Sequence, residues 1–141
     1  TLLPLPTLFL SFIRRFYEAK QNNVGVVTLW GTGSSRREFI YVEDVVKACI
    51  HLLSIDMESV ELPVNIGVGE DISIKELAGK IAHVAGYEGE ILWDTTKPDG
   101  APQKLLDSSS LNQSGWKSEM DFDRGIDITY RWYTDNIANI K

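Results

Sequence analysis

Residues 97–107 read Lys-Pro-Asp-Gly-Ala-Pro-Gln-Lys-Leu-Leu-Asp, and this stretch is the most informative part of the chain. Its two prolines and its glycine fix a loop, because proline locks φ and glycine admits positive φ. The stiff backbone carries three charged side chains, those of Lys97, Asp99 and Lys104. A hydrophobic core does not need this combination, whereas a rigid loop of this kind usually holds something polar in place. A surface connection that is stiffened for stability remains the alternative for this loop taken alone.

A second informative stretch, from Trp30 to Phe39, reads Trp-Gly-Thr-Gly-Ser-Ser-Arg-Arg-Glu-Phe. The apolar run 26–30 before it predicts a strand. The glycines fail as a dinucleotide-binding fingerprint, because Arg36 stands at the third glycine position and no helix opens directly after the loop. Glycine-exposed backbone N–H groups and a planar guanidinium suit a phosphate or diphosphate. A solvated Arg-Arg pair at a loop end is the alternative.

Composition limits the class of protein. A chain of 141 residues, with 43% hydrophobic and 24% charged residues, predicts one globular domain over 1–141. Its net charge of −6 argues against a nucleic-acid partner, so the arginine clusters indicate a small anionic ligand. The one cysteine, Cys49, excludes an internal disulfide and is expected to be buried in a helix. His51 and His83 are far apart in the sequence, and no metal site is predicted.

The apolar amino-terminal stretch, 2–16, is not expected to enter a membrane. Pro4, Pro6, Arg14 and Arg15 interrupt it, and it is too short to span a bilayer. It has neither a basic start nor a small-residue cleavage site, so we predict no signal peptide. The expected location is the cytoplasm.

The rest of the chain alternates between helical and extended patterns, which predicts an α/β fold. A capping box at Ser73 and Glu76 opens a helix that ends at Gly86. In the helix 43–54 we expect a buried side formed by Val45, Val46, Cys49, Ile50 and Leu53. Trp116 and Trp132 are expected to be core or hinge aromatics rather than ligand-stacking ones. The other predicted helices are 7–21, 108–114 and 122–137, and the other predicted strands are 63–67 and 90–93.

Six motifs together resemble a known family. The run Arg-Glu-Phe-Ile-Tyr-Val-x-Asp occurs in many nucleotide-sugar epimerases and dehydratases, whereas Lys-Pro-Asp-Gly-x-Pro-x-Lys-Leu-Leu-Asp is far more specific. In order and spacing the set resembles the carboxy-terminal part of the GDP-L-fucose synthases, which are extended short-chain dehydrogenase/reductases. The resemblance covers 12–136, and 1–11 looks divergent or disordered. The motifs are Trp30-Gly-Thr-Gly, Arg37-Glu-Phe-Ile-Tyr-Val-Glu-Asp44, Asn65-Ile-Gly-Val-Gly69, Lys97-Pro-Asp-Gly, Lys104-Leu-Leu-Asp107 and Gly115-Trp116.

The resemblance implies a division of labour between two halves of the enzyme. In this family an amino-terminal Rossmann half binds NADP(H) and supplies the catalytic Ser, Tyr and Lys, while the carboxy-terminal half covers the GDP-sugar. The chain has no Tyr-x-x-x-Lys, since Tyr17 and Lys20 have the wrong spacing. The resemblance therefore implies a substrate-binding domain that is inactive alone, with the Rossmann half as its missing partner and a homodimer as the full enzyme. We expect no catalytic or cofactor-binding residue and no bound cofactor in this chain.

The resemblance also implies a set of substrate-binding residues. It places Arg15 in contact with the substrate, Trp30 beside the nucleotide and Arg37 at the GDP diphosphate. Asp99 matches a substrate-binding aspartate, and Lys104 matches a lysine near the site. The role of Arg37 agrees with the phosphate interpretation reached from the residues themselves.

One position departs from the family pattern, and two other interpretations stay open. The family carries a general-acid histidine before the first helix, where this chain has Thr7 or, in a second alignment, Thr1. The chain is therefore not expected to hold the proton donor of the 3,5-epimerisation. The alternatives are the substrate domain of another nucleotide-sugar epimerase or dehydratase, and a folded fragment without catalysis.

Overall fold

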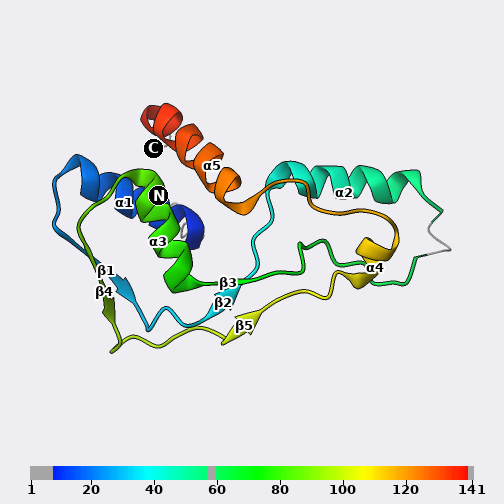
Figure 1. Cartoon of the computed structure of the whole chain (residues 1–141), viewed down its shortest axis with the longest axis horizontal. Coiled ribbons are helices and arrows are strands. Elements are labelled where there is room, and N and C mark those ends of the chain that lie inside the picture. Colours follow the sequence, from blue (N-terminus) through cyan, green and yellow to red (C-terminus); the bar gives the residue numbers. More distant parts are fainter. Residues whose placement is uncertain (1–7, 57–59, 140–141) are drawn as a thin grey trace.

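The computed structural model describes residues 8–56 and 60–139, and over these residues the predicted α/β class is confirmed. The predictions for residues 1–7, including Thr1 and Thr7, lie outside the described residues. Figure 1 shows the arrangement of the elements. They follow one another as α1 (Leu8–Gln21), β1 (Val26–Trp30), β2 (Arg36–Arg37), α2 (Val42–Ser54), β3 (Ile72–Ser73), α3 (Ile74–Ala85), β4 (Glu90–Asp94), β5 (Gln103–Lys104), α4 (Ser109–Gln113), α5 (Phe122–Asn136) and the 3-10 helix η2 (Ile137–Asn139).

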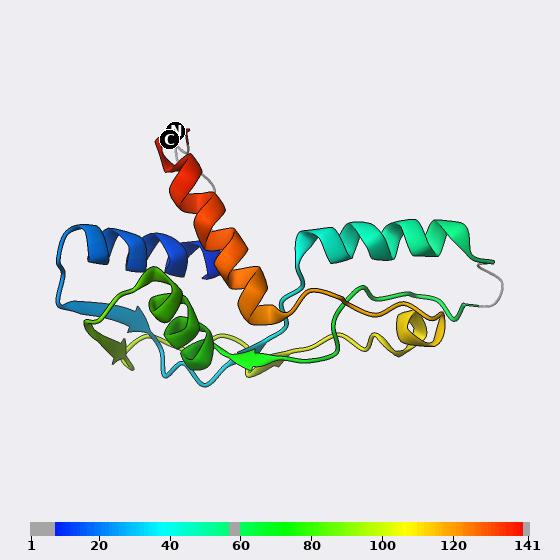
Figure 2. The ribbon, with the colours of Figure 1, turned by 45° about the horizontal axis from the view of Figure 1, so that its top comes forward.

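The larger hydrophobic core lies between a strand pair and three helices. β1 and β4 pair in parallel, with Val26 opposite Glu90 and Trp30 opposite Asp94. α1 and α3 pack together beside this pair, and α5 runs at a steep angle to α1 (Figure 2). The most deeply buried side chains of this core come from four elements. They are Ile13 and Phe16 of α1, Leu29 of β1, Leu77 and Ile81 of α3, and Ile126 of α5.

A small three-stranded sheet connects this core to the rest of the molecule. β2 is its middle strand, antiparallel to β3 and parallel to β5. Asp71 holds the three strands together, because its carboxylate accepts hydrogen bonds from Arg36 Nε at 2.5 Å and from Gln103 Nε2. These hydrogen bonds, that from Gln103 first and that from Arg36 second, lower the pKa of the Asp71 carboxyl below its ordinary value.

α2 and α4 form a separate part of the molecule with a small core of its own. Figures 1 and 2 both show α2 extending away from the helices of the larger core. The core of this part is a second hydrophobic cluster, whose buried residues are Ala48, Leu111 and Trp116. Trp116 is therefore a core aromatic, as expected.

A buried carboxylate fixes the start of α2. Asp44 is only 1% exposed, and its Oδ2 accepts hydrogen bonds from Ser118 Oγ at 2.6 Å, from Met120 N at 2.9 Å and from Glu119 N at 3.2 Å. Burial alone would raise the pKa of Asp44, but these hydrogen bonds outweigh burial and lower it. α2 is thereby tied to the segment that leads into α5.

Local sequence signals place the helix ends correctly. The predicted capping box is present at Ser73, whose hydroxyl accepts from Glu76 N at 3.1 Å while the Glu76 carboxylate accepts from Ser73 N at 3.0 Å. α3 ends at Gly86, which has the left-handed φ of 63° expected of a C-cap glycine. Among the described helices, none is both long and apolar enough to cross a membrane.

Three expectations about packing are wrong. The predicted strand 63–67 is irregular, because no described segment pairs with it. The expected buried side of α2 is mostly its outer side, where Val46, Ile50 and Cys49 are exposed, because Asp44 and Ala48 face inward instead. Trp132 is 56% exposed, since its neighbour Tyr133 takes the inward position on α5.

Candidate functional site

The two informative loops of the sequence lie against each other. Asp99 Oδ1 accepts from Thr32 N at 2.9 Å, and Asp99 Oδ2 accepts from Thr32 Oγ1 at 2.6 Å, across 67 positions of sequence. Gly31 makes this approach possible, because a Cβ at its position would collide with the Asp99 carboxylate. Gly33 is equally constrained, since its Cβ would lie 2.7 Å from the ring of Trp93. Both glycines have positive φ, so they serve to pack the two loops together.

The Asp99 carboxylate is engaged by the opposite loop. The Thr32 hydroxyl, followed by the backbone amides of Thr32 and Gly33, lowers the pKa of the Asp99 carboxyl below its ordinary value. Since both carboxylate oxygens already accept hydrogen bonds from Thr32, Asp99 holds the loop that follows Trp30. Its predicted contact with a substrate stays a prediction.

Trp30 ends β1 with its indole largely in solvent, at 68% exposure. Lys97 Nζ lies 5.8 Å from the centroid of the Trp30 ring, within the range of a cation–π contact. An exposed indole leaves apolar ring surface in water and so contributes less to the stability of the fold than a buried one. Trp30 is thus a largely exposed aromatic residue beside Lys97, and its predicted place beside the nucleotide stays a prediction.

The adjacent arginines 36 and 37 have different partners. Arg36 is a structural cation, bound to the Asp71 carboxylate and 3.9 Å from Glu76 Oε2. Arg37 Nη1 donates to Ala101 O at 2.7 Å and to Arg36 O at 2.6 Å. Within residues 8–56 and 60–139, no carboxylate forms an ion pair with Arg37. Neutral carbonyls thus hold the Arg37 guanidinium in place while its charge stays available to an anion.

The proline loop approaches Arg37 closely. A side chain on Gly100 would lie 2.9 Å from Arg37 Nη2, so the glycine leaves room for the guanidinium. Lys104 pairs with Arg37 in the parallel β2–β5 register, and its side chain is exposed. Arg15 lies on α1, where its Nη1 donates to Thr28 O of β1 at 3.1 Å. The structure therefore brings Asp99 against the loop that follows Trp30, pairs Arg37 with Lys104 between β2 and β5, and places Arg15 beside β1.

Glu38 was not among the predicted site residues, although it connects three segments. Its Oε1 accepts from Gly69 N at 2.7 Å and its Oε2 accepts from Leu106 N at 3.2 Å. A Cβ on Gly67 would meet the same carboxylate. Glu38 thus links β2 to the motifs that contain Gly69 and Leu106. Because successive side chains of a strand point to opposite faces, the position of Glu38 next to Arg37 was the sequence signal that could have indicated its role.

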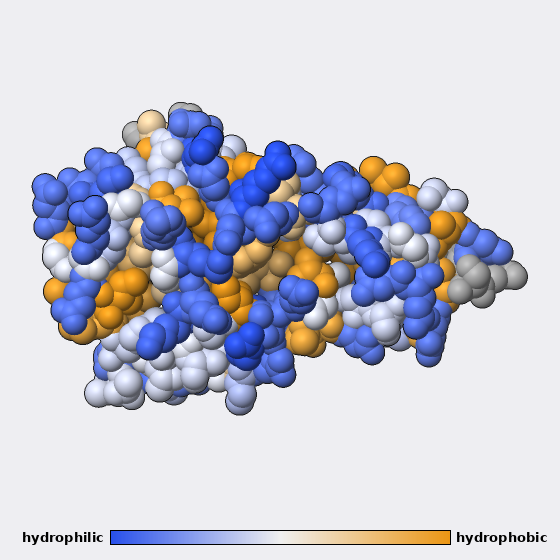
Figure 3. Space-filling model, in the orientation of Figure 1, coloured by the Kyte–Doolittle hydropathy of each residue, from blue (hydrophilic) through white to orange (hydrophobic). Residues whose placement is uncertain are grey.

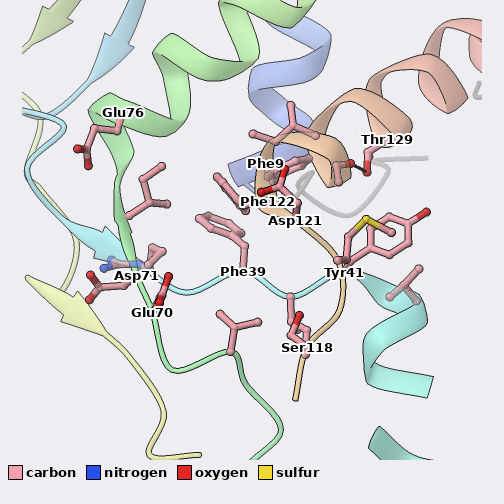
Figure 4. Close-up of a pocket in the computed structure, with 18 of the residues that line it drawn as sticks. Phe9, Phe39, Tyr41, Glu70, Asp71, Glu76, Ser118, Asp121, Phe122 and Thr129 are labelled. Atoms are coloured by element: carbon pink, nitrogen blue, oxygen red, sulfur yellow. Dashed lines mark hydrogen bonds between the residues drawn. The ribbon is translucent and has the colours of Figure 1, made fainter. Parts of the chain in front are cut away.

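A cavity of about 1,080 Å³, which was not predicted from the sequence, adjoins Arg37 between α1, α5, α2 and the small sheet. Arg36 and Arg37 are among the residues that line it. Figure 4 shows Phe9, Phe39 and Phe122 gathered in its middle. Glu70, Asp71 and Glu76 lie at one side of it, and Asp121 lies beside Phe122. Because Arg36 already pairs with Asp71 and Glu76, Arg37 is the cation of this cavity without an ion pair among the described residues.

Neither a metal ion nor a dinucleotide fits the side chains around these loops. Within the described part of the chain, no three His, Cys, Asp or Glu side chains come together in a group able to hold a metal ion. The glycine loop at 31–33 leads into β2 instead of a helix, and Asp99 and Trp93 occupy the space beside its glycines. These residues do not fit the diphosphate of a dinucleotide.

The sequence matches known proteins over nearly its whole length. Residues 6–67 match the NAD dependent epimerase/dehydratase family. Over 129 residues the chain is 46% identical to GDP-L-fucose synthase 1 of Arabidopsis thaliana, an alignment that covers 92% of this chain and 39% of that protein. Over 133 residues it is 39% identical to the GDP-L-fucose synthase of Escherichia coli, with 89% of this chain and 41% of that protein covered.

A solved structure supports the same relationship. The GDP-mannoheptose C4 reductase of Campylobacter jejuni, determined with NADP bound, superimposes with a TM-score of 0.79 at 32% identity, over 92% of this chain and 45% of that one. The chain spans about two fifths of the length of the curated relatives it matches. As its motifs predicted, the chain resembles part of the GDP-L-fucose synthases, and its residues 6–67 resemble the NAD dependent epimerase/dehydratase family.

Proposed function

We propose that this chain is the GDP-sugar-binding half of a GDP-L-fucose synthase. The proposed full-length enzyme converts GDP-4-keto-6-deoxy-D-mannose to GDP-L-fucose by 3,5-epimerisation and NADPH-dependent 4-reduction. The observation that carries the proposal is the guanidinium of Arg37, which the backbone carbonyls of Arg36 and of Ala101 in the proline loop hold in place beside a cavity. A fixed cation of this kind is suited to a diphosphate.

The substrate residues have distinct proposed roles. Arg37 binds the diphosphate, and the exposed indole of Trp30 lies against the guanine base. Lys104 and Arg15 add positive charge, while Asp99 contacts the substrate through whatever hydrogen-bonding capacity the Thr32 bonds leave. A diphosphate held far from C3, C4 and C5 of the sugar positions those carbons while they react, which is how binding energy becomes positioning.

NADP(H) supplies the hydride for the reduction at C4, and we propose that it binds mainly to a part of the enzyme outside this chain. The poor fit of the 31–33 loop to a dinucleotide supports this assignment. The catalytic Ser, Tyr and Lys belong to that same part, so the 141-residue chain is proposed to be inactive alone. The homodimer implied for the full enzyme and the cytoplasmic location stay predictions.

Titration of the amide chemical shifts with GDP, and with UDP as a control, tests the proposal. Saturable shifts at residues 30–37 and 99–104 that are stronger for GDP are expected. Arg37→Ala should weaken GDP binding roughly 10- to 150-fold, as the loss of a hydrogen bond to a charged group implies. Arg131→Ala is the matched control, because Arg131 pairs with Asp127 on α5.

Two results would overturn the proposal. Equal responses to GDP and UDP would favour another nucleotide-sugar epimerase or dehydratase, the first alternative. No shifts at millimolar concentrations of either nucleotide would favour a folded fragment that does not bind. Trp30→Ala separates base stacking from phosphate binding, and Trp132→Ala is its control because Trp132 is also an exposed tryptophan.

A further inference from the structure

The segment 97–107, which contains the proline loop and β5, buries little apolar surface. Every residue in it is exposed, and Figure 3 shows mainly hydrophilic and neutral residues along the lower edge of the molecule, where this segment lies in Figure 1. Polar contacts therefore have to hold the segment in place. Its position matters for the candidate site, because the Ala101 carbonyl accepts a hydrogen bond from the Arg37 guanidinium.

Backbone hydrogen bonds tie this segment to β2 at Pro102 and Lys104. Arg36 N donates to Pro102 O at 2.8 Å, and farther along Glu38 N donates to the carbonyl of Lys104 at 3.3 Å. In a regular parallel pair the next donor, Leu106 N, would bond to the backbone carbonyl of Glu38. Leu106 N donates instead to the Glu38 side chain, at 3.2 Å from Oε2. The carboxylate thus takes the place of the acceptor that the strand itself would supply.

The Glu38 carboxylate is itself fixed at a crowded position. Its Oε1 accepts from Gly69 N at 2.7 Å. A Cβ on Gly67 would lie 2.5 Å from Glu38 Oε1 and 2.7 Å from the hydroxyl of Ser108, a residue that is only 3% exposed. The glycine at position 67 therefore leaves the space that the carboxylate needs. Because hydrogen bonds to an ionised group are strong, Glu38 is a firm anchor for a segment that has little other support.

We propose that Glu38 is a positioning residue for Arg37. By holding Leu106, its carboxylate keeps the segment 101–106 against β2, and with this segment the Ala101 carbonyl that accepts from Arg37 Nη1 at 2.7 Å. This inference rests on the proposed function, in which Arg37 binds the diphosphate of the nucleotide.

The proposal predicts the opposite of what the charge of Glu38 alone would do. A carboxylate close to an anion-binding arginine repels the anion, so removing its charge should strengthen nucleotide binding if charge is all that acts. If Glu38 positions Arg37, the same change should weaken nucleotide binding, because the guanidinium is then held in place in a smaller fraction of the molecules. The sign of the effect therefore distinguishes the two roles.

Calorimetric titration of single and double variants with GDP tests the proposal. Glu38→Gln replaces one of the two acceptor oxygens with an NH2 group, and it should weaken GDP binding roughly 10-fold. In the Arg37→Ala background the same change should have no further effect, because a positioning residue acts only through the residue that it positions. Glu18→Gln is the matched control, since Glu18 pairs with Arg14 on an exposed side of α1 and should leave binding unchanged.

Two further measurements do not depend on the folding of Glu38→Gln or on a nucleotide. Gly67→Ala displaces the Glu38 carboxylate without removing its charge, so it should also weaken GDP binding, and circular dichroism shows whether each variant is folded. The Arg37 guanidinium donates to two carbonyls in the wild type. In NMR spectra without nucleotide, its Nη1 protons should exchange with water roughly 10-fold faster in Glu38→Gln.

Three results would overturn the proposal. They are GDP binding that is unchanged or tighter in Glu38→Gln, an equal loss of affinity when Glu38→Gln is made in the Arg37→Ala background, and unchanged exchange of the Arg37 Nη1 protons. A wild-type chain that binds no nucleotide overturns the proposed function instead, and the exchange of the Arg37 protons then decides whether Glu38 positions the guanidinium.

Discussion

Asp44 offers a direct test of what holds α2 to the rest of the protein. Asp44→Ala removes the acceptor for three hydrogen bonds, from the Ser118 hydroxyl and from the amides of Glu119 and Met120. Each hydrogen bond to a charged group contributes about 1.5–3 kcal/mol, and since the three share one oxygen their sum is less than additive. We expect the free energy of opening of α2 to fall by about 3 kcal/mol, or roughly 150-fold in the opening equilibrium.

Amide hydrogen exchange measures this opening where it occurs. The amides of α2 should exchange roughly 150-fold faster in Asp44→Ala than in the wild type, whereas those of α3 should change much less because α3 belongs to the larger core. Asp44→Asn keeps an acceptor oxygen but removes its charge, so it should lower the free energy of opening of α2 by about half as much as Asp44→Ala does. Asp123→Ala is the control, because Asp123 is an exposed partner of Lys80 and its loss should cost at most about 1 kcal/mol.

The pH dependence adds a second readout of the same carboxylate. Because folding lowers the pKa of Asp44, its stabilisation is complete above the pKa of the unfolded chain and is lost as pH falls through the folded pKa. Asp44→Asn should lack this contribution and be less sensitive to acid in α2. A change of under 1 kcal/mol in Asp44→Ala, or one no larger than in Asp123→Ala, would refute the reasoning.

Three further changes test the loops and the helix caps. Gly33→Ala places a methyl group 2.7 Å from the ring of Trp93, at a residue with positive φ, and should lower the stability measured by thermal denaturation by about 2 kcal/mol. Gly79→Ala is its control, because Gly79 lies in open space on α3, and this change should raise stability by about 0.5–1 kcal/mol. Equal effects of the two would contradict the packing of the glycine loop. Ser73→Ala removes the capping box and should cost about 1 kcal/mol, so an unchanged melting temperature would argue against it. In an NMR titration Asp99 should show a pKa below its ordinary value, and its bonds to the glycine loop should persist above that pKa and be lost as pH falls; an ordinary pKa would contradict them.

Local sequence signals predicted the parts of the fold that depend on neighbouring residues. The α3 capping box, the left-handed Gly86 and the apolar run of β1 were each visible because their physics acts within a few residues. The two-residue strands β2, β3 and β5 were not predicted, since they exist only through pairing between segments 35 or more positions apart. The apolar residues of α2 were assigned to the wrong face because periodicity identifies a stripe but not what covers it.

The candidate site was only partly readable from the sequence. Rigid loops carrying charges indicated that 30–37 and 97–104 hold something polar, and the structure brings these loops into contact. The neighbouring residues did not distinguish Arg36 from Arg37. Arg36 has a structural role only because the fold brings Asp71, 35 positions away, close enough to form an ion pair with it. Neither Glu38 nor the cavity beside Arg37 was predicted, since both depend on residues far apart along the chain.

The parallel pairing of β1 with β4 also sets the order of events during synthesis. Val26 pairs with Glu90, so the apolar strand Val-Val-Thr-Leu-Trp leaves the ribosome 64 residues before its partner. At translation rates of about 5–20 residues per second, β1 waits roughly 3–13 s without its native neighbour. Its edge lacks that partner during the interval, and an unpaired apolar edge of this kind is where aggregation of an incomplete chain is expected to begin.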